Sequence, residues 1–218
     1  MQDDTRTFFT SDPHWFHTNI IRYAERPFAT IDEMHAVMIE RWNAVVRPHD
    51  IVVSLGDLSL GRNSEAIALQ GSLNGTQRVV AGNHDAWFSE SGASPGKKDA
   101  ALRALAAAGI ETLPEQTEAD LVDEQTGQTV TFDVSHFPYV GDHAGQDRYS
   151  NKRMPDLGRP MLHGHVHQEW LVRQAPTRRD GSPGSLQLNV GVDVHGFSPV
   201  HSQVLVDIAL GRRPDLTG

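Results

Sequence analysis

Residues 51–57 read Ile-Val-Val-Ser-Leu-Gly-Asp, and residues 78–85 read Arg-Val-Val-Ala-Gly-Asn-His-Asp. Each stretch begins as a short apolar run, which predicts a buried strand, and then turns polar directly after a glycine. A segment of helical character at 64–73 separates the two stretches. This alternation indicates an α/β fold with polar residues at the carboxyl ends of its strands, where open α/β sheets place their ligands.

The same pattern extends over the rest of the chain. Thr30-Ile-Asp-Glu33 predicts a capping box at the start of a helix, and Gln125-Thr-Gly-Gln128 predicts the turn of a hairpin. Loops of the length of 141–159 and 174–184 are typical of functional lids or disordered segments. We expect strands at 7–11, 51–55, 78–81, 121–123, 130–135, 160–162, 170–173 and 186–190, and helices at 19–24, 34–46, 64–73 and 98–108.

Composition narrows the class of protein. The 218 residues suit one domain spanning 1–218. Since the chain has no Cys, disulfide scaffolds, thiolate metal sites and cysteine catalysis are excluded. The net charge of −9 argues against a general polyanion-binding protein. The N-terminus lacks a signal-peptide pattern and no apolar run reaches the roughly 20 residues of a membrane span, so we expect a cytoplasmic protein without a membrane partner.

The 12 His residues are the unusual feature of the composition, and several fall in polar clusters after predicted strands. Carboxylate, amide and imidazole donors together suit Mn, Fe, Co, Ni or Zn better than Mg or Ca, which prefer shells of oxygen alone. The clusters are Asp12-Pro-His14, Gly56-Asp57, Gly82-Asn-His-Asp85, Ser135-His136 and Gly164-His-Val-His167.

Spacing within the clusters predicts how their side chains point. Asp12 and His14 are two residues apart, so an extended backbone would direct both to the same side, and the same holds for His165 and His167. A glycine precedes Asp57 and begins two other clusters, where it allows a sharp turn and removes a Cβ that would crowd a ligand.

Taken in order, these five motifs resemble the calcineurin-like metallophosphoesterase superfamily. They span residues 12–167, and Trp15-Phe-His-Thr-Asn-Ile-Ile-Arg22 with Arg26-Pro-Phe28 also resembles small bacterial and phage members. The resemblance implies a two-layer β sandwich flanked by helices, with a dinuclear metal site at its edge. Purple acid phosphatases of this superfamily carry a Tyr three residues after the bridging Asp, where this chain has Leu60, so that branch is disfavoured.

The resemblance also implies a role for each motif residue. Two divalent ions are expected, with Mn first and Fe, Ni, Co or Zn as alternatives. His84 would protonate the leaving oxygen, with Asp85 orienting its ring. The first metal would be held by Asp12, His14, Asp57 and His167. The second would be held by Asp57, which bridges the two, together with Asn83, His136 and His165. Substrate contacts are expected from Asn83, His84, His17 and Arg148.

Simpler interpretations of several residues stay open at this point. His136 alone would be an ordinary core or surface residue, with His143 as its nearest rival. His163 shares a predicted strand face with the later histidines, and only the family pattern selects His165 and His167. Asn83 suits a turn and Asp85 a helix cap. His17 fits a helix surface equally well, and a solvated loop is somewhat favoured for Arg148.

The resulting prediction is a metal-dependent phosphoesterase, a phosphodiesterase or phosphatase. Its substrate would be a small phosphodiester or a nucleotide-type phosphoester, hydrolysed by a metal-bridging hydroxide. A metal-dependent nuclease is the alternative, disfavoured by the acidic charge because nucleic-acid affinity draws on Lys and Arg. A non-catalytic interaction scaffold on the same fold is a further alternative. The sequence leaves the oligomeric state open.

Overall fold

The computed structural model describes residues 5–142 and 147–213. The helices are α1 (Ile20–Tyr23), α2 (Ile31–Val45), α3 (Asn63–Gly71), α4 (Pro95–Ala107) and α5 (Ser202–Ala209). The strands are β1 (Thr7–Thr10), β2 (Ile51–Ser54), β3 (Thr76–Val79), β4 (Glu111–Thr112), β5 (Gln116–Val122), β6 (Thr129–Ser135), β7 (Met161–His163), β8 (Val172–Gln174), β9 (Leu186–Asn189) and β10 (Val200–His201).

These strands form two five-stranded sheets. The first has the order β10-β1-β2-β3-β4, in which β1 to β4 run parallel and β10 pairs antiparallel with β1. The second has the order β5-β6-β7-β9-β8, with β6, β7 and β9 parallel. The predicted mixture of helices and strands is therefore confirmed, as is the hairpin, which joins β5 to β6 through residues 123–128.

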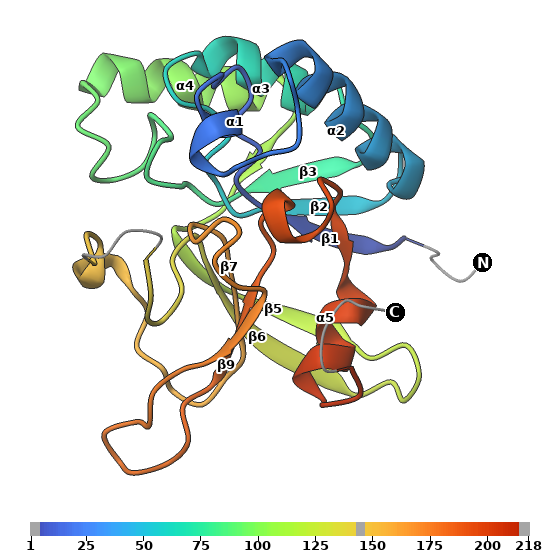
Figure 1. Cartoon of the computed structure of the whole chain (residues 1–218), viewed down its shortest axis with the longest axis vertical. Coiled ribbons are helices and arrows are strands. Elements are labelled where there is room, and N and C mark those ends of the chain that lie inside the picture. Colours follow the sequence, from blue (N-terminus) through green and yellow to red (C-terminus); the bar gives the residue numbers. More distant parts are fainter. Residues whose placement is uncertain (1–4, 143–146, 214–218) are drawn as a thin grey trace.

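Burial on both faces of the first sheet sets the layering (Figure 1). Phe8 and Phe9 are neighbours on β1 and point to opposite faces, as the two-residue period of a strand requires. Phe8 packs with Trp42 of α2, whereas Phe9 packs with Phe132 of the second sheet. The helices α1 to α4 thus cover one face of the first sheet, and the second sheet faces the other.

Two helix starts differ in detail from the predictions. The Thr30 hydroxyl accepts the Glu33 backbone N–H at 3.1 Å, as a capping box requires, but the Glu33 carboxylate accepts the N–H of Ala29 rather than that of Thr30. Helix α4 begins at Pro95, three residues before the predicted start, because Pro fits the first turn of a helix, where no backbone donor is needed.

No helix in the described part of the chain is long and apolar enough to cross a membrane.

Candidate metal centre

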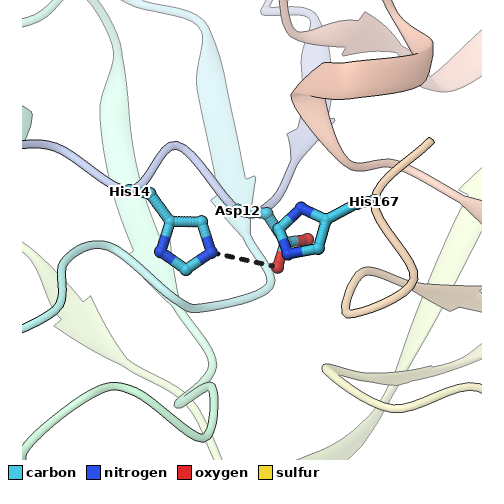
Figure 2. Close-up of side chains that lie close together, drawn as sticks. All are labelled: Asp12, His14 and His167. Atoms are coloured by element: carbon cyan, nitrogen blue, oxygen red, sulfur yellow. Dashed lines mark ion pairs between the residues drawn. The ribbon is translucent and has the colours of Figure 1, made fainter. Parts of the chain in front are cut away.

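The carboxyl ends of strands from both sheets meet at one edge of the molecule. The loops after β1, β2 and β3 bring Asp12, His14, Asp57 and Asn83, and the segments after β6 and β7 bring His136, His165 and His167. Two groups of these residues can each hold a metal ion, because within each group the ligand atoms lie within 4.8 Å of one another. One group is Asp12, His14 and His167 (Figure 2), and the other is Asp12, Asp57 and His136.

Left-handed backbone places most of these side chains. The φ angles are 57° at Asp12, 51° at His14, 54° at Asp57, 71° at His165 and 47° at His167. Such angles cost non-glycine residues about 1 kcal/mol each and persist only where surrounding structure enforces them. The prediction that an extended backbone points the side chains of each motif pair to the same side is therefore wrong. Both residues of each pair have left-handed, not extended, backbone.

Close packing explains the glycines in the motifs. Gly56 has a φ of 94°, and an added Cβ would collide with the backbone of Gly82. A Cβ on Gly82 would collide with the Asp57 carboxylate, and one on Gly164 would collide with Ser11 and Asp12. Of these three glycines only Gly56 has a left-handed φ, whereas Gly82 and Gly164 are needed because the loops touch each other.

Asp12 and His14 are fully enclosed, yet their polar atoms are not all satisfied. Among the described residues, Oδ1 of Asp12 and both ring nitrogens of His14 lack a hydrogen-bond partner. His14 Nε2 lies 4.0 Å from Asp12 Oδ1 (Figure 2) and 3.8 Å from Asp57 Oδ2. Burial raises the pKa of Asp12, and burial together with the charge of His167 lowers the pKa of His14. Unsatisfied buried donors and acceptors of this kind need a partner.

The ring of His136 is oriented by the backbone. Its Nδ1 lies 2.7 Å from the carbonyl oxygen of Leu55, and since a carbonyl only accepts, Nδ1 carries the proton. In the neutral ring, Nε2 is then an acceptor. It faces two further acceptors, Asn83 Oδ1 at 3.1 Å and Asp57 Oδ2 at 3.5 Å. A bound cation would satisfy all three, and the orienting contact to a carbonyl is typical of metal-ligating histidines.

His167 is oriented by a pair of residues that sequence reasoning missed. Its Nδ1 lies 2.9 Å from Oδ2 of Asp193, and Arg26 binds both oxygens of Asp193, at 2.7 and 3.1 Å. Burial lowers the pKa of His167, but the hydrogen bond to Asp193 and the charge of Asp12 outweigh it, so this pKa is raised.

Arg26 also anchors the first motif. Its guanidinium donates to the carbonyl oxygens of Asp12 at 2.7 Å and Pro13 at 3.0 Å, and its side chain is completely buried. It therefore ties the turn between Asp12 and His14 to Asp193, 167 residues away in sequence. The only sequence signal was the position of Arg26 within the family-like segment 26–28 and of Asp193 after a strand.

The two remaining histidines of β7 and its loop differ from each other. His165 donates its backbone N–H to Asp12 Oδ2 at 3.0 Å, and its Nε2 lies 3.3 Å from Asp142 Oδ1, a neighbour the sequence did not indicate. His163 packs against Trp170, with 4.6 Å between ring centroids. Burial lowers the pKa of His163 to about 3, so its ring is neutral at pH 7.

The structure corrects the predicted partnership of His84 and Asp85. Asp85 is fully buried, and its carboxylate accepts the backbone N–H groups of Asp57, Leu58 and Gly82 at 2.8–2.9 Å. It thus fixes the two glycine turns and does not orient the ring of His84. His84 is placed by its backbone N–H, which donates to Asp57 Oδ1 at 2.8 Å, and its side chain is 34% exposed beside the site.

The residues predicted to contact substrate lie at different distances from this centre. The ring of His17 packs edge-on against that of His14, with centroids 5.5 Å apart, so it borders the site. Burial lowers the pKa of His17. Arg148 pairs with Asp142 at 3.2 Å and lies over the Tyr149 ring, which in turn contacts His165. His143, the rival of His136, lies outside the described residues.

Comparison with known proteins gives relatives along nearly the whole chain. The gene 66 protein of Mycobacterium phage L5 is 32% identical over 200 residues, covering 88% of each chain. The chain belongs to this gene 66 family. A second member, from Mycobacterium phage D29, is 31% identical over 90% of this chain and 92% of its own length.

No protein-family profile matches this gene 66 family member. Among solved structures, its fold is similar to that of a protein of unknown function from Aquifex aeolicus. The TM-score is 0.61 with 18% sequence identity, over 94% of this chain and all of the other. At that identity the likeness extends to the fold alone.

Proposed function

We propose that this protein is a dinuclear metal-dependent phosphoesterase with a calcineurin-like fold. The observation that carries the proposal is the convergence of buried acceptor atoms at one edge: Asp12 Oδ1, the ring of His14, and Nε2 of His136 facing Asp57 and Asn83. Acceptors facing acceptors in a buried site repel one another unless a cation lies among them. The motif order that resembles the metallophosphoesterases supports the same function.

The donor set fits two ions of the predicted kind. Asp12, His14, Asp57 and His167 would hold one, and Asp57, Asn83, His136 and His165 the other. The mixture of carboxylate, amide and imidazole suits Mn and its transition-metal neighbours. When bound, such a pair supplies Lewis acidity toward a phosphoryl oxygen and lowers the pKa of water.

The side chains of the protein complete the chemistry. In hydrolysis the oxygen of water joins phosphorus, the bond from phosphorus to the leaving oxygen breaks, and the leaving oxygen takes up a proton. His84 is the residue placed to donate that proton from Nε2, because it is partly exposed and lies 4.0 Å from Asp57 Oδ2. The proton lost by water returns His84 to its charged form, so the cycle balances. Arg26 and Asp193 act by holding His167 and the turn after Asp12 in place.

The test is hydrolysis of bis-p-nitrophenyl phosphate by the purified protein with added Mn²⁺, followed at pH 7 with and without a chelator. We expect turnover that the chelator abolishes. Variant His84→Ala should lower kcat by about 10²- to 10⁴-fold, the usual contribution of a general acid. The matched control is His49→Ala, which removes an exposed imidazole just before β2, at the opposite end of the strand from Asp57. Equal activity of the two variants would overturn the assignment of His84, and absence of any metal-dependent turnover would overturn the proposed function.

A further inference from the structure

A cleft adjoins His84 on the side of the helices. Its volume is about 540 Å³, within the range of small-molecule sites, and it lies between the start of α3 and residues 97–104 of α4. Asn63 and Ser64 line one side of it, and Lys97 and Ala100 line the other. His84 lines the cleft, and its Nε2 lies 4.0 Å from Asp57 Oδ2, so the cleft adjoins the metal-binding edge at His84.

The charge of the cleft is opposite to that of the chain. Apart from His84, the only ionisable side chain among its described lining residues is Lys97, and none of them is Asp or Glu, in a chain with 28 acidic residues. Lys97 is exposed and makes no ion pair with the described part of the chain. A cation with no internal partner beside an open cavity favours an anionic ligand.

One of the two helices beside the cleft adds to this positive charge. α3 and α4 both start at the cleft, and neither N-cap residue, Arg62 or Ser94, provides a side-chain hydrogen bond to its helix. The N-terminus of a helix carries partial positive charge on its first N–H groups. The start of α4, which has no acidic residue in its first turn, therefore reinforces Lys97, whereas Glu65 in the first turn of α3 offsets the partial charge there.

Small side chains leave the cleft open. Ala100, Ala101 and Ala104 form the α4 side, and a Cβ added to Gly61 or Gly92 would meet no atom within 4 Å. The room is suited to an organic group, since the lining mixes alanines with polar residues such as Ser64.

We propose that this cleft binds the leaving-group half of the substrate, and that this half carries its own negative charge, which Lys97 pairs with. The assignment rests on the proposed function, because His84 protonates the leaving oxygen and the leaving group must then lie on the His84 side of the phosphorus. The substrate class is therefore a phosphoester of an anionic alcohol or phenol.

The test uses two chromogenic diesters that differ in one group, methyl 4-carboxy-2-nitrophenyl phosphate and its neutral 4-carbamoyl counterpart, each with Mn²⁺. Wild-type protein should show a KM about fivefold lower for the carboxylate, the effect of one partly exposed ion pair. Lys97→Gln should make the two KM values equal and Lys97→Glu should reverse their order. Arg103→Gln removes an exposed charge from α4 outside the cleft and should keep the wild-type ratio.

A binding measurement separates this inference from the proposed function. In calorimetry, 4-hydroxy-3-nitrobenzoate should bind wild-type protein about fivefold more tightly than the matching benzamide does. The two compounds should bind Lys97→Gln with equal affinity. Ala100→Phe, which fills the cleft from an exposed position, should weaken the binding of both compounds without lowering the thermal midpoint of unfolding.

If both diesters are hydrolysed but Lys97→Gln keeps the wild-type KM ratio, the cleft assignment is wrong and the proposed phosphoesterase function stands. If neither diester is hydrolysed, the proposed function fails instead.

Discussion

The two ends of β2 each bury an aspartate, but only one end supplies its own countercharge. Asp50, before the strand, accepts hydrogen bonds from Arg6 Nη2 at 2.6 Å and from the backbone of Arg47 at 2.8 Å. Burial alone would raise the pKa of Asp50, yet these two arginines hold it well below its usual range. Asp57 follows the strand, and its ion-pair contacts within the described part of the chain are all with histidines, among them His14 and His136.

The contrast distinguishes a structural carboxylate from one suited to a ligand. At the Asp50 end two arginines neutralise the carboxylate, so it needs no ligand after folding. At the Asp57 end, burial raises the pKa of Asp12 and Asp85, which marks carboxylates short of positive charge. A divalent cation would supply what the arginines supply at the other end.

The largest expected effect is on activity. Asp57→Asn removes the carboxylate shared by both proposed ions while keeping the size of the side chain, so metal-dependent hydrolysis of bis-p-nitrophenyl phosphate should fall about 10³-fold, which corresponds to about 4 kcal/mol. Asp50→Asn should retain kcat when assayed well below its own melting temperature. Activity of Asp57→Asn within tenfold of wild type would remove the distinction between the two ends.

Metal addition should stabilise the protein through the Asp57 end of β2 only. Mn²⁺ at a hundred times its Kd should raise the free energy of unfolding by about 2.7 kcal/mol for each ion bound, in wild-type protein and in Asp50→Asn, measured by urea titration. The gain should be lost in Asp57→Asn and on adding a chelator. An equal gain in all three proteins would mean that the ion binds elsewhere.

Without metal, Asp50→Asn should destabilise the protein more than Asp57→Asn does. Asp50→Asn should lower the free energy of unfolding by about 2 kcal/mol at pH 7, a moderate value because both arginine partners are about one-third exposed. Since the folded pKa of Asp50 is lowered, its contribution is present above about pH 4 and is lost as the pH falls further. Wild-type and Asp50→Asn stabilities should therefore converge in acid. Metal-free Asp57→Asn should be no less stable than wild type, and a loss matching that of Asp50→Asn would contradict this account.

The smallest effect concerns the support of His167. Asp193→Asn should weaken Mn²⁺ binding about tenfold, the lower end of what loss of an orienting partner costs, because the amide still accepts from His167 but no longer neutralises Arg26. Calorimetric titration measures the affinity, with Asp207→Asn on α5 as the charge control. Unchanged affinity would show that Asp193 serves folding alone.

Sequence patterns predicted those parts of the molecule that local chemistry determines. Short apolar runs ending in glycine and polar residues marked β2 and β3 and the loops that carry Asp57 and Asn83, since burial and turn formation act over a few residues. The two-layer arrangement, by contrast, was expected from the family resemblance and not from the strand patterns themselves.

Contacts between distant segments could not be predicted from the sequence. Arg26 reaches Asp193 only after both sheets have formed, and Asp85 bonds to backbone groups whose positions depend on the turns at Gly56 and Gly82. The family resemblance implied that Asp85 orients the ring of His84, its neighbour in sequence, and no local pattern indicated the backbone partners of Asp85. The left-handed backbone at His14 was equally hidden, as non-glycine residues rarely adopt it.

The most direct test of the central claim is the metal content of the protein after equilibrium dialysis against Mn²⁺, measured by inductively coupled plasma mass spectrometry. If the Asp57 end of β2 is completed by cations, as the two arginines complete the Asp50 end, wild-type protein and Asp50→Asn should retain two ions per chain and Asp57→Asn should retain fewer. Wild-type protein that retains none, or Asp57→Asn that retains as many as wild type, would contradict it.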